Sequence, residues 1–308
     1  MIDLSIIILN YNTPNLVKQC LKNIKKSLSA ETQGQAFLPG DYEIIIIDNG
    51  SKNKIDLDQP GFEETWFANI KVIYSPQNRG FAAGHNLGLA ASNGRYVLIL
   101  NPDIVVLNDA ILKMRQFMEA HQEIAILGPG LLNPDRTWQY SCHRWPKFWT
   151  PLFTRTALGK TKLGKKELIR YNMLDYDHLE PRAVDCLFGA ALMIRKDFLD
   201  KSGGFNEKYF LYYEDIDLCR TAWKMSTKDK NQQNSSSKFQ VPSFKFQVWY
   251  LPQAQMIHYH KRLSARQSPW RSIFNKVFWI HIASHWKYFR QWGIYNSKIK
   301  SQKSKIKM

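Results

Sequence analysis

The stretch Leu4-Ser-Ile-Ile-Ile-Leu-Asn-Tyr-Asn12 gives the clearest indication of how this chain folds. Its unbroken aliphatic run is typical of a parallel strand buried on both faces, and the polar residues after it would lie at an edge of the sheet. A helix is expected directly afterwards, because Thr13 is a good N-cap and Pro14 suits the first helical position. A second aliphatic run at residues 43–47 predicts another strand, and this order is that of a parallel α/β sheet.

Polar residues follow each of the first four expected strands. Two further strands are expected at residues 71–74 and 96–100, and a helix follows each of them. The polar residues are Asn10, Tyr11 and Asn12 after the first strand, Asp48 after the second, Asn78 and Arg79 after the third, and Asn101 and Asp103 after the fourth. Open α/β sheets bind ligands at the carboxyl ends of their strands, so this series favours a ligand site there.

The second half of the chain changes character after residue 130. Aromatic and basic residues alternate over 138–155, and a strand-like run covers 184–194. The polar, low-complexity stretch at 226–247 predicts a flexible insertion. An aromatic helix is expected over 270–292, and it would either pack across the main domain or dock on an anionic membrane.

The charge of the chain excludes few partners but favours anions. There are 43 Lys and Arg against 26 Asp and Glu, which gives a formal net charge of +17. Such a surface attracts nucleotides, nucleic acid or acidic lipid headgroups. Part of the excess lies in residues 296–308, which contain five lysines and no acid. This tail is interpreted either as a solvated basic segment or as a membrane-surface attachment.

The cysteines and the length of the apolar segments indicate in which cellular compartment the protein is expected. The four cysteines lie far apart, without the spacing of a paired metal site, and reduced thiols are the simplest interpretation. The sequence has neither a charged leader followed by an apolar run nor a window of about 18–20 apolar residues. We therefore expect a cytoplasmic protein, with any membrane contact being peripheral, on the inner face of the cell membrane.

The segment at residues 210–220 combines three carboxylates with aromatic and apolar residues at the start of an expected helix. Glu214 and Asp215 would lie in the first helical turn, where the dipole and unpaired N–H groups favour the ionised form. An ionised carboxylate beside aromatic side chains can act as a general base. Ordinary capping of the helix by acidic residues is the alternative.

Together these segments resemble the inverting glycosyltransferases of family two, and among them the rhamnosyltransferase-like members. The resemblance covers roughly residues 2–264 and rests on residues 10–12, 48–51, 78–81 with Gly84 and Asn86, 100–103, 203–205 and 214–215. It implies the GT-A fold, a Rossmann-like mixed and mostly parallel sheet flanked by helices, here with a C-terminal helical extension. The nucleotide-sugar-binding half would be 1–125, the acceptor-binding and catalytic half 126–264, and the aromatic helix and basic tail 265–308.

The resemblance also implies roles for individual residues. Asp215 would take the proton from the acceptor hydroxyl, and Glu214 would position the acceptor or the base. Asp48 resembles the acid that accepts hydrogen bonds from the donor nucleobase, although a turn residue has the same sequence signature. The other donor-binding residues would be Asn10, Tyr11, Asn12, Asn78, Arg79, Asn101 and Asp103.

A divalent cation would be bound by Asp103 and His258. The family often has two Asp residues separated by one position at this place, and here the first of them is Asn101. Mg²⁺ commonly uses one or two carboxylates with phosphates and water, so the departure is compatible with Mg²⁺ or Mn²⁺. A histidine ligand would favour Mn²⁺, and a structural role of His258 is the alternative.

The resemblance implies transfer of a sugar from a nucleoside diphosphate donor to a hydroxyl of a growing glycan or lipid-linked acceptor, in cell-surface polysaccharide synthesis. Rhamnose on deoxythymidine diphosphate is the leading donor, and nucleic acid is not an expected partner. Two alternatives stay open. The basic and aromatic residues at 138–155 are compatible with a nucleic-acid-binding protein. The missing first acid of the metal motif is compatible with a catalytically silent relative that binds a sugar nucleotide.

Overall fold

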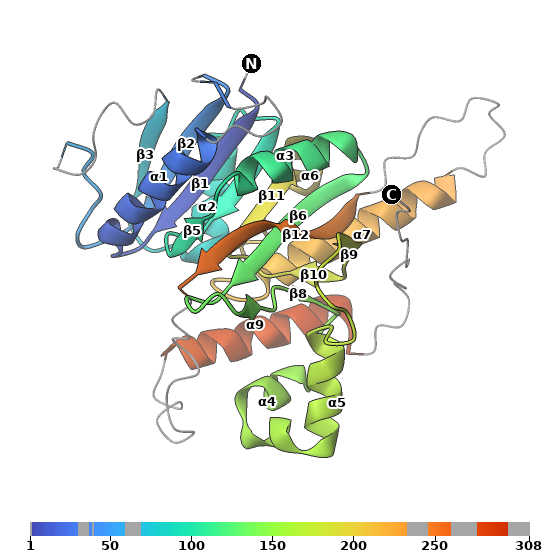
Figure 1. The fold of residues 1–308 in the computed structure, drawn as a ribbon. Helices are drawn as coiled ribbons and strands as arrows, with labels where there is room; N and C mark the ends of the chain where they lie inside the picture. Colours follow the sequence, from blue (N-terminus) through green and yellow to red (C-terminus); the bar gives the residue numbers. More distant parts are fainter. Residues whose placement is uncertain are drawn as a thin grey trace.

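The computed structural model describes residues 2–29, 37–38, 40–58, 69–232, 246–259 and 276–294. Figure 1 shows a central sheet with helices on both faces and a group of helices, α4, α5 and α9, beyond one end of the sheet. The order of the main strands is β3-β2-β1-β4-β11-β6-β12-β5. The expected mixed α/β sheet flanked by helices is confirmed.

The first four strands are parallel and adjacent in the order β3-β2-β1-β4. Their bounds are Leu4–Asn10 for β1, Tyr42–Asn49 for β2, Ile70–Ser75 for β3 and Tyr96–Leu100 for β4. Asn10 is paired with Asp48 in the register, and Asn49 with Ser75. The polar strand ends therefore lie side by side along one edge, as the sequence predicts.

Alternate aliphatic side chains of these strands form two separate cores, one on each face of the sheet. Ile6, Ile8, Ile44 and Ile46 pack with helices α1 (Pro14–Leu28) and α3 (Ala110–Ala120). Ile7, Ile45 and Ile47 pack with α2 (Gly80–Ala90), α6 (Lys196–Ser202) and α7 (Glu214–Gln232). Burial on both faces explains why the strands are continuously hydrophobic rather than alternating.

The second half of the chain completes the same sheet. Strand β11 (Ala191–Arg195) runs antiparallel to β4, and β6 (Ile124–Leu132) lies between β11 and β12 (Gln247–His258). The short strand β5 (Ile104–Val106) pairs with the end of β12. The Gly-Pro-Gly sequence at 128–130 lies inside β6, and the register of β12 shifts opposite it, between Leu251 and Gln255.

Several expected bounds differ from the structure. The strand-like run at 184–194 is divided into β10 (Cys186–Leu187) and β11, which belong to different sheets, and residues 188–190 between them turn toward α7. Helix α7 extends to Gln232 into the expected insertion, whose residues 233–245 lie outside the described part of the chain. The aromatic helix α9 spans Lys276–Trp292; residues 270–275 and the basic tail after residue 294 also lie outside the described part.

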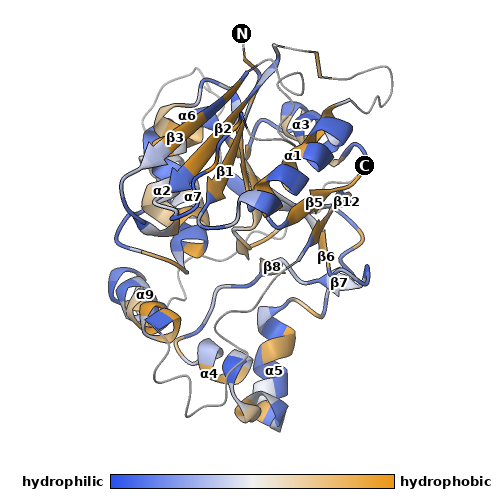
Figure 2. Cartoon of the chain, turned by 90° about the vertical axis from the view of Figure 1, so that its left-hand side faces the viewer, coloured by the Kyte–Doolittle hydropathy of each residue, from blue (hydrophilic) through white to orange (hydrophobic). Residues whose placement is uncertain are grey.

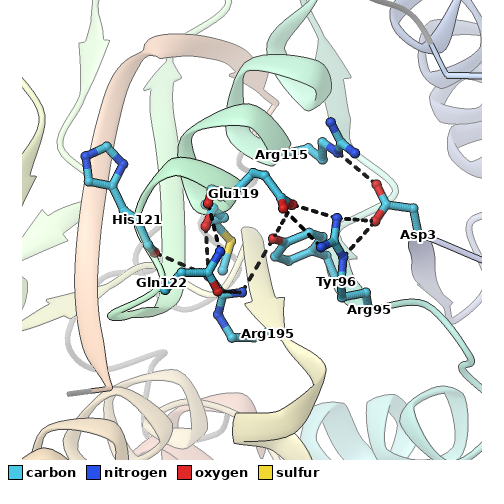
Figure 3. Close-up of polar contacts among 9 residues, drawn as sticks. Asp3, Arg95, Tyr96, Arg115, Glu119, His121, Gln122 and Arg195 are labelled. Atoms are coloured by element: carbon cyan, nitrogen blue, oxygen red, sulfur yellow. Dashed lines mark hydrogen bonds and ion pairs between the residues drawn. The ribbon is translucent and has the colours of Figure 1, made fainter. Parts of the chain in front are cut away.

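A polar network joins β1, β4, α3 and β11 at the end of the sheet away from the polar strand ends (Figure 3). Arg195 donates to the backbone oxygens of Met118 and His121 at 2.8 and 3.2 Å, which caps the C-terminus of α3. Arg115 on α3 forms an ion pair with Asp3 at 2.8 Å. Its guanidinium requires a charged partner that an aliphatic core would not provide.

The remaining elements are short. They are β7 (Trp138–Gln139), β8 (Cys142–His143), α4 (Thr150–Arg155), the 3₁₀ helix η2 (Ala157–Lys160), α5 (Lys162–Tyr171) and β9 (Arg182–Ala183). Strands β8 and β10 form a separate two-stranded sheet. Helices α4 and α5 form a hairpin that projects from the rest of the molecule (Figure 1).

Candidate active site

The first part of the candidate site is the junction between β1 and β2. Asp48 is buried, and its carboxylate accepts hydrogen bonds from the backbone N–H groups of Ser51 and Ile55 at 2.9 and 3.0 Å. It also accepts one from the side-chain amide of Asn10 at 3.0 Å. The structure therefore brings these two expected donor-binding residues together, and uses both oxygens of Asp48 to hold the loop that follows β2.

The residues after β1 lie at the surface of this junction. Asn12 has a left-handed backbone with φ 58°, and its side-chain oxygen accepts a hydrogen bond from the N–H of Lys52 at 2.8 Å. The side chain of Tyr11 is 48% exposed. An exposed aromatic ring beside a rigid loop is able to stack on a planar ligand.

The turn before α2 connects the donor side to the segment that precedes α7. Asn78 accepts hydrogen bonds from the Asn49 side chain and from the Gly80 N–H at 3.1 and 2.9 Å. Phe81 N–H donates to the Phe210 oxygen at 2.7 Å, and a Cβ at Gly80 would lie 2.2 Å from the same oxygen. Arg79 forms an exposed ion pair with Glu207 at 3.3 Å. Asn78 and the first N–H groups of α2 thus have partners within the protein.

Asp103 and His258 approach one another beyond the end of β4. Oδ1 of Asp103 lies 3.5 Å from Nε2 of His258, which is buried at the end of β12. Nδ1 of His258 lies 2.7 Å from Oε1 of Gln139, so Gln139 orients the ring. A histidine oriented through its other ring nitrogen is a common arrangement in metal sites.

The chemistry of these two side chains fits a divalent cation. Within the described residues, no group of three or more His, Cys, Asp or Glu side chains is arranged to hold a metal ion. Asp103 and His258 could provide two ligands, and a cation of the Mg²⁺ or Mn²⁺ type would take the others from phosphate oxygens and water.

Residues 188–190 connect Asp215 with the surroundings of Asp103 and His258. Gly189 N–H donates to Oδ2 of Asp215 at 2.8 Å, and the oxygen of Ala190 accepts a hydrogen bond from Asn101 N–H at 2.9 Å. The ring of Phe188 lies 6.0 Å from that of His258, measured between centroids. One three-residue segment thus touches the expected base, the strand end before Asp103, and the expected metal ligand His258.

Glycine permits the close contact between this segment and Asp215. A Cβ added at Gly189 would lie 3.0 Å from the Cβ of Asp215 and 3.1 Å from its Oδ2. The small residues noted in the sequence at 189–191 therefore allow the backbone to approach the carboxylate closely.

The backbone before the carboxylates has an unusual conformation. Tyr212 and Tyr213 both have φ 72°, a left-handed conformation that is rare for bulky residues. Such conformations cost of order 1–3 kcal/mol each and cluster at functional sites. Helix α7 begins immediately afterwards with Glu214 and Asp215.

The two adjacent carboxyl groups lie in different environments. Glu214 is buried, and its Oε2 has no hydrogen-bond partner. Burial raises the pKa of Glu214 well above its ordinary value of 4.5, and the neighbouring negative charge of Asp215 adds to this shift. Asp215 is half-buried; burial raises its pKa above 3.8, while hydrogen bonds from the N–H groups of Gly189 and Ile216 oppose the shift. Asp215 is therefore the easier of the two to ionise.

Sequence reasoning missed how α9 is anchored beside this segment. Asp217 is buried and accepts hydrogen bonds from Trp292 and Gln291 at 2.6 and 2.9 Å. Arg220 donates to the hydroxyl of Tyr288 at 2.6 Å. The spacing of Asp217 and Arg220 on one face of α7 was the available signal, because buried charges need partners and a late aromatic helix offers indole and phenol groups.

The sequence also matches a known family. Residues 5–202, more than half of the chain, match the family described as Glycosyl transferase family 2. The chain belongs to glycosyl transferase family 2.

Three curated relatives have a low but extended similarity to the chain. The low-salt glycan biosynthesis hexosyltransferase Agl10 of Haloferax volcanii is 27% identical over 228 residues, which cover 71% of this chain and 61% of that protein. The N-acetylglucosaminyl-diphospho-decaprenol L-rhamnosyltransferase of Mycobacterium tuberculosis is 24% identical, over 57% of this chain and 59% of that protein. Rhamnosyltransferase WbbL of Escherichia coli is 23% identical over 300 residues, 95% of each chain. The chain thus spans about three fifths of the length of the first two of these relatives.

A solved structure supports the fold. The crystal structure of GalNAc-T7 with UDP, GalNAc and Mn²⁺ aligns with a TM-score of 0.60 and 14% identity, covering 95% of this chain and 48% of that chain. At this identity the similarity concerns the fold alone. Among the described residues, none of the helices is long and apolar enough to cross a membrane.

Proposed function

We propose that this chain is an inverting glycosyltransferase that moves a sugar from a nucleoside diphosphate donor to a hydroxyl group of a glycan or lipid-linked acceptor. The observation that carries the proposal is the contact of residues 188–190 with Asp215, with Asn101 and with the ring of His258. Sugar transfer needs a base and a site for the leaving diphosphate at opposite sides of one sugar, and we assign these to Asp215 and to Asp103 with His258.

In the proposed step, the acceptor oxygen forms a bond to the anomeric carbon of the donor. The bond from that carbon to the diphosphate oxygen breaks, and its electron pair leaves with the nucleoside diphosphate. The hydroxyl proton passes to the carboxylate of Asp215. Its raised pKa makes it a stronger base than an exposed Asp. Displacement from the opposite face inverts the anomeric configuration.

The role of Glu214 in this proposal is to position the base. Its side chain is buried and its pKa is raised well above the ordinary value, so it is favoured in the neutral form. A neutral neighbour leaves Asp215 with the negative charge, because two adjacent carboxylates in a desolvated place do not both ionise readily.

The donor diphosphate would lie beside Asp103 and His258, with a cation of the Mg²⁺ or Mn²⁺ type. When bound, such a cation would neutralise the charge that develops on the leaving diphosphate. Asp103 would supply a carboxylate oxygen and His258 its Nε2, which Gln139 orients through the other ring nitrogen. Asn101 would contribute to the shape of the donor site rather than a charge.

The nucleobase would bind at the junction of β1 and β2. Tyr11 and Asn12 would line the base, while Asp48 and Asn10 would hold the loop that surrounds it. Asn78 and Arg79 would define the edge of this donor site toward α2. Deoxythymidine diphosphate rhamnose is the leading donor, since two relatives are named as rhamnosyltransferases. We place the enzyme in the cytoplasm, acting in cell-surface polysaccharide synthesis.

A catalytically silent relative that binds a sugar nucleotide is the second candidate, favoured by Asn101 at the position of the first acid of the metal motif. A screen of nucleotide sugars with Mg²⁺ or Mn²⁺, first by thermal shift and then by donor turnover, distinguishes the two. An active enzyme should unfold at a higher temperature with one of the donors and should turn that donor over. The Asp215→Asn variant should bind the same donor without turnover. Binding without any turnover in the wild type, with acceptor hydroxyls supplied, would support the silent relative. Asp200→Asn on α6 is the matched control, because Asp200 is an exposed carboxylate remote from the site.

A further inference from the structure

The hairpin formed by α4, η2 and α5, here called the basic hairpin (residues 147–171), has a polar centre. Glu167 is buried and accepts a hydrogen bond from the hydroxyl of Thr150, which is also buried, at 2.5 Å. Arg170 and Lys147 form ion pairs with the same carboxylate at 2.6 and 3.3 Å. Charges and hydrogen bonds therefore hold the buried centre of the hairpin.

Four of the five leucine and isoleucine side chains of the basic hairpin are exposed, and only Leu168 is partly buried. The exposed fractions are 47% for Leu152, 46% for Leu158, 74% for Leu163 and 48% for Ile169. Single exposed leucines are common on protein surfaces, but a group of them on one small projection indicates an interaction surface.

The surface around these side chains is strongly basic. Residues 147–171 contain seven Lys and Arg and a single acid, the buried Glu167. Lys162, Lys165 and Lys166 are exposed on α5, on the same side of the helix as Leu163 and Ile169. The exposed surface thus combines aliphatic side chains with positive charge and carries no negative charge.

This combination fits an anionic lipid bilayer. Lysines near such a surface are attracted by its negative potential, and aliphatic side chains between them gain free energy by entering the acyl boundary. Nucleic acid would use the positive charge but not the outward leucines, and a second copy of this chain would bring an equally basic surface against it.

The basic hairpin lies close to the segment that carries Asp215. Arg155 at the end of α4 lies 5.9 Å from the ring of Tyr212, three residues before Asp215. The ring of Phe148, just before α4, contacts that of Trp286 on α9 at 5.2 Å, and Trp286 is 58% exposed. Figure 2 shows α4, α5 and α9 together beyond one end of the sheet.

We propose that the outer face of the basic hairpin docks on an anionic lipid bilayer and holds the acceptor side of the active site against it. Resting on the proposed function, this makes the acceptor a hydroxyl compound anchored in the bilayer. The docking surface itself is independent of catalysis.

Vesicle binding of the full chain tests the docking. Wild-type protein is expected to co-sediment with vesicles of phosphatidylglycerol and phosphatidylcholine, more weakly at higher salt, and not with vesicles of phosphatidylcholine alone. The variant with Lys162→Glu, Lys165→Glu and Lys166→Glu should bind about a hundredfold more weakly, since each lysine contributes roughly a factor of five to ten. The matched control carries Lys22→Glu, Lys25→Glu and Lys26→Glu, which have the same spacing on α1 and change the net charge equally.

A second variant keeps the charge and removes the apolar contribution. Leu158→Gln with Leu163→Gln should weaken vesicle binding at least about tenfold, whereas Leu38→Gln, at an equally exposed leucine before β2, should not. Thermal unfolding of each variant checks that it is folded, and donor turnover with a soluble acceptor should stay at the wild-type level. That turnover is a separate readout, so failure of the proposed function leaves the vesicle result interpretable.

Three results would overturn the proposal. One is wild-type binding to anionic vesicles that both hairpin variants retain. Another is a loss of binding in the α1 control as large as that in the α5 variant, which would indicate attraction by net charge alone. The third is wild-type protein that does not bind these vesicles and instead forms a dimer, or a complex with single-stranded nucleic acid, that the hairpin variants lose.

Discussion

The two sides of the candidate site differ in how completely their polar groups are hydrogen-bonded and in how strained their backbone is. On the donor side, Asp48 accepts three hydrogen bonds from Asn10, Ser51 and Ile55, and every partner is held by the strands β1 and β2 or by the loop after them. On the catalytic side, Tyr212 and Tyr213 have left-handed backbones and Glu214 has a buried oxygen without a hydrogen bond. The donor side is thus stabilised by its polar residues, whereas the catalytic side is held in place at a free-energy cost.

Helix α9 explains how the catalytic side can keep its conformation. The hydroxyl of Tyr213 lies 2.9 Å from Nδ1 of His285, and the ring of Tyr212 lies 4.8 Å from that of His281. Asp217 and Arg220 bind the last turns of the same helix. Strain in an active-site segment persists only where surrounding contacts determine the conformation, and here α9 provides them.

The largest expected effect concerns activity on the catalytic side. Asp215→Asn removes the base but keeps the shape of the side chain, so transfer should fall at least about a hundredfold. Nucleotide affinity and the free energy of unfolding should stay near wild-type values. Donor turnover, isothermal titration with the nucleoside diphosphate and urea unfolding measure the three quantities; unchanged turnover would remove Asp215 from the catalytic role.

On the donor side, the second largest effect is expected on stability rather than on activity. Asp48→Ala removes one of the two acceptors of the buried Asn10 amide, which keeps only Ser51, and leaves the backbone N–H groups of Ser51 and Ile55 without their acceptor. This should lower the free energy of unfolding by about 3 kcal/mol. Asp56→Ala, at an exposed Asp of the same loop, should change it by less than about 0.5 kcal/mol. Equal effects of both substitutions in urea unfolding would contradict the structural role of Asp48.

A smaller effect, with the opposite sign, is expected from Glu214→Gln. Because the folded pKa of Glu214 is raised, the wild type loses stability as the pH rises from about 4.5 toward that folded pKa. The glutamine variant has no such loss, so it should be more stable than the wild type at pH 8, by about 1 kcal/mol or more. The gain should shrink toward pH 4.5. A variant that is equally destabilised at both pH values would show that Glu214 is ionised in the folded protein.

The smallest effect is local loosening of α9 in acid. Burial lowers the pKa of His281 to about 3 and that of His285 to about 4, from an ordinary value of 6.5. The free energy that these neutral histidines contribute to folding is therefore fully present above pH 6.5. It is lost as the pH falls from 6.5 toward 4.

Hydrogen exchange at pH 7 and pH 5 measures this loosening. Corrected for the intrinsic pH dependence, amides of α9 should lose more protection than those of α1, and His281→Gln with His285→Gln should reduce the difference. Equal loss in both helices would attribute acid sensitivity to other buried histidines, such as His85 and His143.

The sequence was sufficient for the architecture where the signal was local. The aliphatic run of β1 and the polar residues after it predicted both the parallel sheet and the edge at which Asn10 and Asp48 meet. The sequence changes character after residue 130, but the Gly-Pro-Gly sequence at 128–130 stays within β6, opposite a register shift in β12 more than a hundred residues later.

The contacts within the site depend on partners that are far apart in sequence. Gln139 and His258 are 119 residues apart, and no local pattern indicates that one orients the other. Helix α5 was not among the elements expected from the sequence, and its residues do not tell which side faces the protein. The outward direction of Leu163 follows only from the buried position of Glu167, which its ion pairs decide.

The most direct test of a single shared site is a crystal structure of the chain with Mn²⁺ and the nucleoside diphosphate of its donor. We expect an anomalous scattering peak bonded to Asp103 and His258 and to the diphosphate, with the carboxylate of Asp215 on the far side of the sugar position. The same crystals of Asp103→Ala should lose the peak. A peak elsewhere, or a diphosphate bound where Asp215 is turned away from it, would contradict the account.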